Sequence, residues 1–167
     1  MAELYQIYYP SPIGTILVSA TGEAVVSVLF TEDAAVPAVP TGLIPACLQA
    51  CRQQLTEYFA GDRQDFTLPL ASSGTPFQEQ VWQQLGQIRY GHTLSYFDLS
   101  RQMGNPAAIR AVGHANGKNK LLLLRPCHRV IGSDGQLVGY AGGLWRKQWL
   151  LAHERTISGS SQLSLFK

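Results

Sequence analysis

Residues 95–117 read SYFDLSRQMGNPAAIRAVGHANG, and this stretch carries the signals for two short helices joined by a tight turn. Ser95 is a suitable N-cap for the first helix, which Gly104 ends. Asn105 and Pro106 begin the second helix, since proline is favoured at the first helical position. Two short helices around a glycine-containing turn predict a helix-turn-helix, although any helical hairpin can share this pattern.

The second of these helices is rich in small residues, which would let its backbone approach a partner closely. Two readings are open: tight packing against another helix, or contact with DNA. Arg110 lies in the middle of the small-residue face and favours DNA, because arginine neutralises phosphate. The small residues of this face are Ala107, Ala108, Ala111 and Gly113.

The first part of the chain has the pattern of strands followed by a helix. Strand-like runs at residues 4–9, 15–20 and 24–30 are separated by PSPIG and TGE, which have turn chemistry. A proline-rich connector at residues 31–42 leads to apolar residues at helical spacing, which end at Gly61.

The helix-turn-helix is flanked by further elements. A capping-box pattern at Thr75 begins a helix before it. After it, residues 129–131 and 136–140 flank the turn sequence GSDG, and a hairpin in this position is the wing of a winged helix. Residues 142–154 predict a closing helix. The residues that this helix offers to the core are Leu144, Trp149 and Leu151.

The sequence therefore predicts an α+β protein with two domains. Residues 1–73 form a small β-sheet with one helix. Residues 74–157 form a mostly helical winged helix-turn-helix domain that binds DNA and carries the active site. Residues 158–167 form a C-terminal tail.

Charge is divided unevenly along the chain. From Gly74 onward there are eleven lysines and arginines against four acids, a net charge of +7. The first 73 residues carry two arginines against seven acids, a net charge of −5. A basic half joined to an acidic half favours a polyanionic partner for the second half over ordinary surface scatter.

Several classes of protein are excluded. The longest wholly aliphatic run is four leucines, so we expect no membrane span and no membrane partner. The N-terminus lacks a signal-peptide pattern, and three cysteines make no disulfide framework, so we expect a cytoplasmic protein. Cys47 and Cys51 lie four residues apart on the predicted first helix but lack further ligands nearby, which favours packing over metal binding.

The stretch LLLLRPCHRVIG, residues 121–132, places a cysteine in apolar surroundings between charged neighbours. Cys127 could be a packing residue, a metal ligand or a nucleophile. His128 and Glu154 could serve as its base and as the group that orients the base. Adjacent side chains on an extended chain point in opposite directions, so Cys127 and His128 need a helical turn or a bridging water to interact.

Taken in order, PCHRV with Asn119 upstream, SY at residues 95–96, IRAVGHANG, GYAGG and RKQWLLAHE resemble the O6-alkylguanine-DNA alkyltransferase family. The resemblance extends from Gly74 to about Glu154, and SPIG and LTEYFAG continue it into the first half. It implies an RNase H-like first domain. It also implies direct DNA repair by an irreversible, single-turnover transfer of the alkyl group from O6-alkylguanine, and possibly O4-alkylthymine, in double-stranded DNA to a cysteine.

The resemblance assigns a role to each residue around that cysteine. Cys127 matches the alkyl acceptor and His128 the base that activates it through a water. Glu154 matches the carboxylate that orients the histidine. Asn119 matches the asparagine that bridges the helix-turn-helix to the active-site segment, and Tyr140 matches a tyrosine of the pocket.

The resemblance also implies that DNA is bound through the minor groove, with the damaged nucleotide flipped out of the stack. Tyr96 matches the tyrosine that helps rotate the nucleotide and protonates the guanine ring. Arg110 matches the arginine that fills the vacated space. The remaining residues expected to contact DNA are Ala107, Ala108, Ala111, Gly113 and Arg129.

Three positions depart from the family pattern, namely Arg125, Lys120 and Ile109. An unpaired buried guanidinium would be costly, so Arg125 must reach water, an acid or DNA phosphate. We expect it to turn outward with its stem packed and its guanidinium in water. No histidine lies in the first half, so we expect no metal there and no cofactor, and the protein is expected to be a monomer. Two alternatives are open: a non-catalytic lesion sensor of the alkyltransferase-like kind, and a Cys-His thiol hydrolase.

Overall fold

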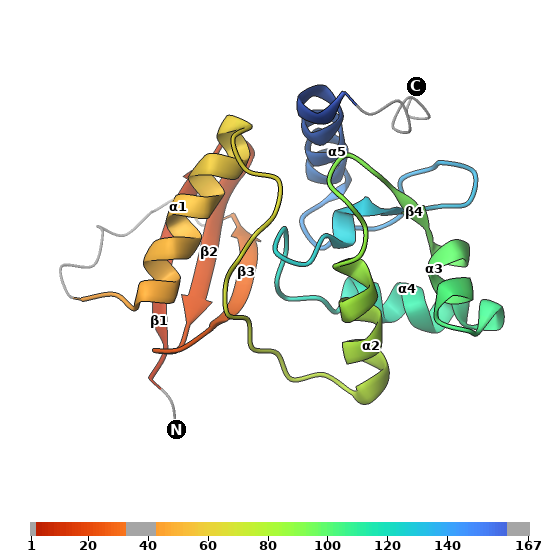
Figure 1. The fold of residues 1–167 in the computed structure, drawn as a ribbon, viewed down its shortest axis with the longest axis horizontal. Helices are drawn as coiled ribbons and strands as arrows, with labels where there is room; N and C mark the ends of the chain where they lie inside the picture. The colour runs from red at the N-terminus through yellow and green to blue at the C-terminus, as the bar shows by residue number, and fades with distance from the viewer. Residues whose placement is uncertain (1–2, 33–42, 160–167) are drawn as a thin grey trace. The chain divides into compact units, whose positions relative to one another are not determined.

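The computed structural model describes residues 3–32 and 43–159, which form two compact units, Met1–Ser72 and Ser73–Lys167 (Figure 1). Each unit has its own core, so the two are described separately. Within the described ranges, no helix is long and apolar enough to cross a membrane. The α+β class expected from the sequence is confirmed. The predicted tail falls outside the described residues beyond Gly159.

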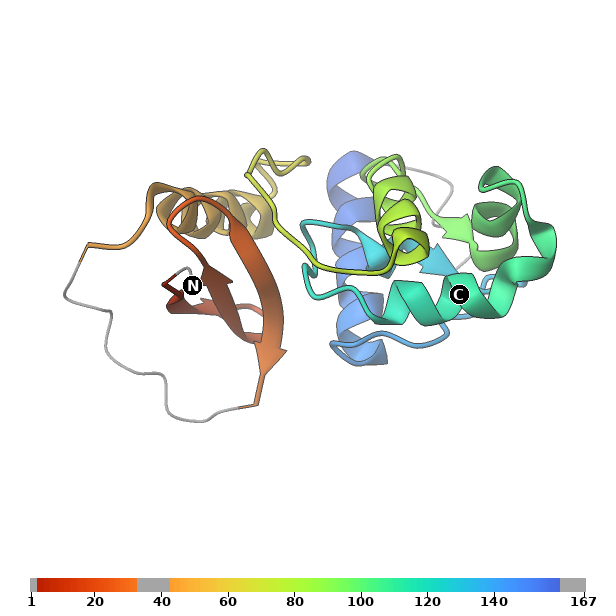
Figure 2. The same cartoon turned by 90° about the horizontal axis from the view of Figure 1, so that it is seen from below.

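The first unit is a three-stranded antiparallel sheet covered by one helix (Figure 2). Its strands are β1 (Tyr5–Ser11), β2 (Gly14–Ala20) and β3 (Val25–Thr31), and its helix is α1 (Ala46–Ala60). Ile16 and Val18 of the central strand are fully buried against the helix side of the unit, as alternation along a half-buried strand requires. Gly61 ends α1 in the left-handed conformation, where its lack of a Cβ avoids strain. Cys47 and Cys51 are buried free thiols.

The second unit is mainly helical. Its helices are α2 (Pro76–Leu85), α3 (Tyr96–Gln102), the 3-10 turn η1 (Pro106–Ala108), α4 (Ile109–Gly117), the 3-10 turn η2 (Cys127–Arg129) and α5 (Leu144–Ser158). Thr75 and Gln78 form the predicted capping box of α2, and Ser95 caps α3. Gly104 makes the turn between α3 and η1 with a φ of +82°.

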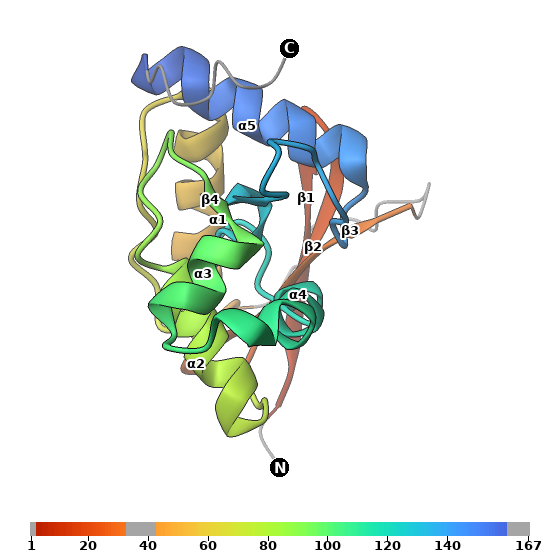
Figure 3. The ribbon, with the colours of Figure 1, turned by 90° about the vertical axis from the view of Figure 1, so that its right-hand side faces the viewer.

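Helices α3 and α4 lie side by side as a helix-turn-helix, and α2 packs against α4 (Figure 3). The second helix differs from the prediction in one detail: it begins as the single 3-10 turn η1 and becomes α-helical at Ile109. Val112 and Ala115 of α4 are buried, and the indole Nε1 of Trp82 donates a 2.8 Å hydrogen bond to the Ala115 carbonyl.

The predicted wing hairpin forms only its turn. Gly132 donates to the Gln136 carbonyl at 2.8 Å, but β5 (Val130–Ile131) pairs in parallel with β4 (Leu94–Ser95) instead of with residues 136–140. The reason is that side chains take up a backbone acceptor that a second strand would need. The Val138 carbonyl accepts hydrogen bonds from the side chains of Tyr96 and Lys147. We call residues 132–143, between β5 and α5, the covering loop.

Helix α5 buries Leu151 as expected, but it does not bury Leu144. Leu144 is 48% exposed, whereas Leu150 and Leu151 are buried. The fully buried positions also include Lys147 and Glu154, which lie three residues before Leu150 and three after Leu151. Since positions i, i+3, i+4 and i+7 share one helix face, α5 buries two charged residues beside its leucines.

Candidate active site

Two tight turns carry the leucine run into Cys127. Leu123 is buried with a φ of +71°, a conformation that residues with a branched side chain rarely adopt. Across it, the Leu124 amide donates a 2.8 Å hydrogen bond to the Leu122 carbonyl, which closes a three-residue turn. Pro126 forms the next turn with a φ of −78° and a ψ of 63°, where the Cys127 amide donates to the Arg125 carbonyl at 2.7 Å. These turns fix the direction in which the cysteine leaves the chain, and strain of this kind is typical of functional sites.

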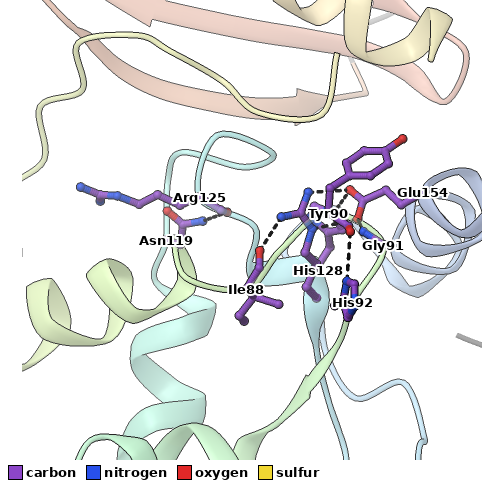
Figure 4. Close-up of polar contacts among 9 residues, drawn as sticks. Ile88, Tyr90, Gly91, His92, Asn119, Arg125, His128 and Glu154 are labelled. Atoms are coloured by element: carbon purple, nitrogen blue, oxygen red, sulfur yellow. Dashed lines mark hydrogen bonds and ion pairs between the residues drawn. The ribbon is translucent and has the colours of Figure 1, made fainter. Parts of the chain in front are cut away.

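Asn119 ties this segment to the end of α4 (Figure 4). Its Oδ1 accepts from the Leu121 amide at 3.0 Å, and its Nδ2 donates to the Arg125 carbonyl at 3.1 Å and to the Leu121 carbonyl at 3.4 Å. The side chain is buried, so its amide replaces water at both ends of the leucine run. Asn119 therefore joins the helix-turn-helix to the segment that holds the cysteine.

Cys127, His128 and Arg129 make up the 3-10 turn η2, and all three are buried. A 3-10 helix has about three residues per turn, so successive side chains leave the backbone about 120° apart. The Cys127 and His128 side chains are thus about 120° apart around the turn, whereas an extended chain would point them in opposite directions. The helical turn, one of the two routes by which the residues could interact, is therefore present.

Glu154 on α5 is the centre of a buried polar cluster (Figure 4). Its Oε2 lies 2.7 Å from His128 Nε2, while Arg129 donates from Nε to Oε1 at 2.8 Å and from Nη2 to Oε2 at 3.1 Å. The backbone amide of Gly91 donates to Oε1 at 3.4 Å. His128 and Arg129 hold the pKa of the Glu154 carboxyl far below its usual range despite burial, so it is a carboxylate.

The two ring nitrogens of His128 have different surroundings. Burial lowers the pKa of His128 below its ordinary value, although Glu154 opposes this effect. The imidazole is therefore neutral near pH 7, with its proton on Nε2 facing the carboxylate. Its Nδ1 is buried and has no hydrogen-bond partner in the part of the chain that the structure describes. A neutral ring in this tautomer can accept a proton at Nδ1.

Burial also acts on the thiol of Cys127. Burial raises the pKa of Cys127 to about 11, while Asn119 and Lys147 act in the opposite direction. The thiol is consequently protonated near pH 7, and a nucleophilic thiolate forms only when the proton is transferred away. Burial also raises the pKa of Cys51, in the other unit, to about 12, but it is Cys127 that is followed in the chain by a histidine bonded to a buried carboxylate.

Lys147 is a site residue that sequence reasoning missed. Its Nζ donates to the carbonyls of Val138 and Gly139 at 3.2 and 3.0 Å and lies 5.8 Å from the centre of the Tyr96 ring. Burial lowers its pKa to about 8, and Cys127 acts against that shift. The spacing of Lys147 from Leu150, Leu151 and Glu154 is the signal that could have placed it on the buried face of α5.

The two predicted tyrosines lie at the same site. The Tyr96 hydroxyl donates to the Val138 carbonyl at 3.0 Å, and burial raises its pKa, which a hydrogen bond from Asn116 opposes. The Tyr140 ring stands edge-on to His128 with the ring centres 6.4 Å apart. The covering loop therefore places the edge of an aromatic ring beside the imidazole.

Two arginines lie elsewhere than expected. Arg129 was expected to contact DNA, but its guanidinium is buried, binds Glu154, donates to the Ile88 carbonyl at 2.7 Å and lies over the Tyr90 ring. Arg125 was expected to reach water, but its side chain is only 16% exposed. It lies 4.0 Å from Glu79 and 5.2 Å over the Trp82 ring, because an acid and an aromatic face replace water there.

The expected DNA contacts on the helix-turn-helix lie at the surface of the second unit. Ala107, Arg110 and Ala111 are exposed, and Ala108 and Gly113 are half-buried. Gly113 lies beside Tyr96, since a Cβ added there would be 3.8 Å from the tyrosine ring. The surface helix and the buried site are thus connected through Tyr96. Within residues 3–32 and 43–159, no cluster of three or more His, Cys, Asp or Glu side chains could hold a metal ion.

Comparisons with known proteins give a consistent result. Residues 76–156 match the model of the 6-O-methylguanine DNA methyltransferase DNA-binding domain, and residues 4–72 match that of the 6-O-methylguanine DNA methyltransferase ribonuclease-like domain.

Two curated relatives and one solved structure illustrate the similarity. A methylated-DNA–protein-cysteine methyltransferase of Methanosarcina acetivorans is 40% identical over 153 residues, covering 90% of this chain and 98% of the relative. The constitutive Bacillus subtilis protein of that name is 52% identical over 109 residues, 65% of this chain and 66% of the relative. The structure of Mycobacterium tuberculosis OGT in complex with DNA has a TM-score of 0.81 at 37% identity, covering 97% and 99% of the two chains.

Proposed function

Because this chain belongs to the 6-O-methylguanine DNA methyltransferase family, we propose that Cys127 is the residue that accepts the alkyl group during DNA repair. The chain is a DNA-binding enzyme of direct alkyl repair, as its similarity to methylated-DNA–protein-cysteine methyltransferases shows. Its substrate in this proposal is O6-alkylguanine in double-stranded DNA. The lesion sensor and the thiol hydrolase are not favoured, since the first needs no acceptor thiol and the second needs no DNA.

One observation carries the proposal. The buried, protonated thiol of Cys127 is followed in the chain by the neutral imidazole of His128. The Nε2 of that ring lies 2.7 Å from the buried carboxylate of Glu154, and its Nδ1 has no hydrogen-bond partner among the described residues. This is the arrangement of a nucleophile, a base and a group that orients the base. The base accepts a proton only while the nucleophile reacts, so the thiol is unreactive until a substrate arrives.

The reaction balances with these residues alone. The Cys127 proton passes through a water to Nδ1 of His128, and Sγ attacks the alkyl carbon of the lesion. The bond between that carbon and O6 breaks, and its electron pair returns to the guanine ring, which takes a proton from the Tyr96 hydroxyl. The proton on His128 then replaces the one that Tyr96 has lost. The products are S-alkylcysteine and guanine, so each chain reacts once.

Base flipping is required because O6 of guanine is paired inside the duplex while the thiol is buried in the protein. The exposed Arg110 is the group that replaces the extruded base, and the small residues beside it allow close contact with the minor groove. We also propose that the chain acts as a monomer. We place it in a reducing compartment such as the cytoplasm, since Cys47, Cys51 and Cys127 are all unpaired thiols.

The decisive experiment is intact mass spectrometry after incubation with a duplex that contains one O6-methylguanine. We expect a mass gain of one methylene, located on Cys127 by peptide mapping, that stops at one equivalent. The matched control is the same duplex with unmodified guanine. Release of methanol with repeated turnover would instead identify a hydrolase, and tight binding without a mass change would identify a sensor.

A further inference from the structure

Arg129 is the cation of the buried cluster, and the reaction proposed above does not use it. Its guanidinium makes two hydrogen bonds to Glu154, one to each carboxylate oxygen, and a third to the Ile88 carbonyl at 2.7 Å. The Tyr90 ring lies against its face, with the centre 5.6 Å from the guanidinium carbon. These contacts leave the arginine in one orientation, and they fix the carboxylate in turn.

The charge balance of the cluster depends on this arginine. A buried carboxylate without a cation would draw a proton onto His128, since an isolated charge in the interior costs far more than an ion pair. His128 would then carry protons on both nitrogens, and Nδ1 could accept none from the thiol. Arg129 supplies the positive charge instead, so that the arginine and the carboxylate are neutral together.

The other titratable and charged groups around the cluster do not replace Arg129. Lys147 approaches from the same helix as Glu154 but donates to the covering loop. Three further titratable groups face the cluster: Cys127 from the η2 turn, Tyr90 from the segment before β4 and Tyr140 from the covering loop. Each is neutral near pH 7, since burial raises the pKa of all three. Arg129 thus forms an ion pair with the carboxylate at 2.8 Å, while His128 meets the same carboxylate as a neutral ring.

We propose that Arg129 is a positioning residue for the alkyl transfer: by neutralising and orienting Glu154, it keeps His128 neutral, with Nδ1 ready to take the Cys127 proton. The inference rests on the proposed function, but it concerns a property of the unreacted protein. It gives the arginine of the PCHRV motif a task inside the protein in place of the DNA contact expected from the sequence.

The test uses three variants of the full chain. Arg129→Met and Arg129→Gln remove the charge, and the glutamine keeps an N–H donor for Glu154 so that folding is better preserved. Arg129→Lys keeps the charge but loses the paired geometry. The matched control is Arg146→Met, which removes another buried arginine of the same unit, one that donates to the Gly142 carbonyl at 3.0 Å.

The first readout is the titration of His128 in each folded variant without DNA, followed by NMR of the imidazole nitrogens. In Arg129→Met and Arg129→Gln we expect the pKa of His128 to rise by about one unit or more, the shift that a neighbouring charge typically causes. In Arg129→Lys the pKa should stay closer to that of the parent, and in Arg146→Met it should not move. An unchanged pKa of His128 in either folded neutral variant overturns the proposal.

The second readout is the single-turnover rate of methyl transfer against pH. We expect the acid limb of this profile to move to higher pH by the same amount in the neutral variants, with the rate recovering at alkaline pH. A purely structural role would lower the rate equally at every pH, and that outcome also overturns the proposal. If the parent chain takes no methyl group, the proposed function fails, while the His128 titration still decides the part played by Arg129.

Discussion

The hydroxyl of Tyr96 donates a 3.0 Å hydrogen bond to the carbonyl oxygen of Val138, which joins the first helix of the helix-turn-helix to the covering loop. Lys147 donates to the same carbonyl at 3.2 Å. In the proposed reaction this hydroxyl protonates the guanine ring, so it must exchange Val138 for the base. We therefore expect entry of the lesion to change the contacts of the covering loop.

Tyr96→Phe removes the shared hydroxyl and keeps the ring that packs beside Gly113. We expect single-turnover repair of duplex DNA to slow by about a hundredfold, the usual contribution of a positioned general acid. Quench-flow mass spectrometry with O6-methylguanine DNA measures the rate. The matched control is Tyr9→Phe, which removes a hydroxyl bonded to Thr56 in the first unit and should leave the rate unchanged. A parent-like rate in Tyr96→Phe would show that the ring alone suffices.

Cys127→Ser should abolish transfer and leave DNA affinity within about twofold of the parent, because phosphate contacts at the surface supply the affinity and the thiol is buried. Intact mass and fluorescence anisotropy with the same duplex measure the two properties. Cys47→Ala is the control, since it removes a buried thiol from the first unit. Stoichiometric alkylation of the serine variant at another residue would contradict the role given to Cys127.

Arg110→Ala should separate flipping from chemistry. Arg110 is exposed on α4, so we expect repair of duplex DNA to slow by about tenfold, equivalent to the loss of one charge-assisted hydrogen bond. Reaction with free O6-benzylguanine should change little, because a free base needs no extrusion. The same loss on both substrates would mean that Arg110 supports the fold or the site itself.

Lys147→Met tests a buried amine whose burial lowers its pKa to about 8. Between pH 8 and the ordinary value of 10.5, the unfolded chain binds this proton and the folded chain does not, so the parent gains stability as pH rises. We expect the free energy of unfolding of the parent, relative to the variant, to increase over this range by up to about 3 kcal/mol. Urea unfolding at several pH values measures it, and a constant difference would contradict the assignment.

Arg125→Val replaces a guanidinium that faces Glu79 and the Trp82 ring. We expect the free energy of unfolding to change by less than about 1 kcal/mol, since a loose ion pair at 4.0 Å contributes little. The pH dependence of thiol labelling at Cys127 should match the parent, because burial, Asn119 and Lys147 set its pKa. A shifted labelling profile would show that the charge of Arg125 reaches the thiol.

Local patterns were enough to predict the helices and the three strands of the first unit. Thr75 and Gln78, Ser95 and Gly104 mark helix ends through interactions within a few residues, and the structure has those ends. The order of the motifs also identified the family, and with it the residues that now meet at one site. Sequence spacing further contained an unused signal, since Lys147 shares its helix face with Glu154.

Tertiary structure decided what each charged side chain touches. Arginine is a mostly exposed residue type, so Arg129 and Arg125 were expected at the surface. Their partners are far away in the sequence, since Glu154 is 25 residues from Arg129 and Glu79 is 46 residues from Arg125. The second arm of the predicted hairpin likewise lost its strand partner to side chains from α3 and α5. The sequence by itself determined the helices, the turns and the reactive residue types, because these depend on contacts within a few residues. Only the folded chain determined the charge balance around His128, because it depends on groups that distant segments bring into one buried volume.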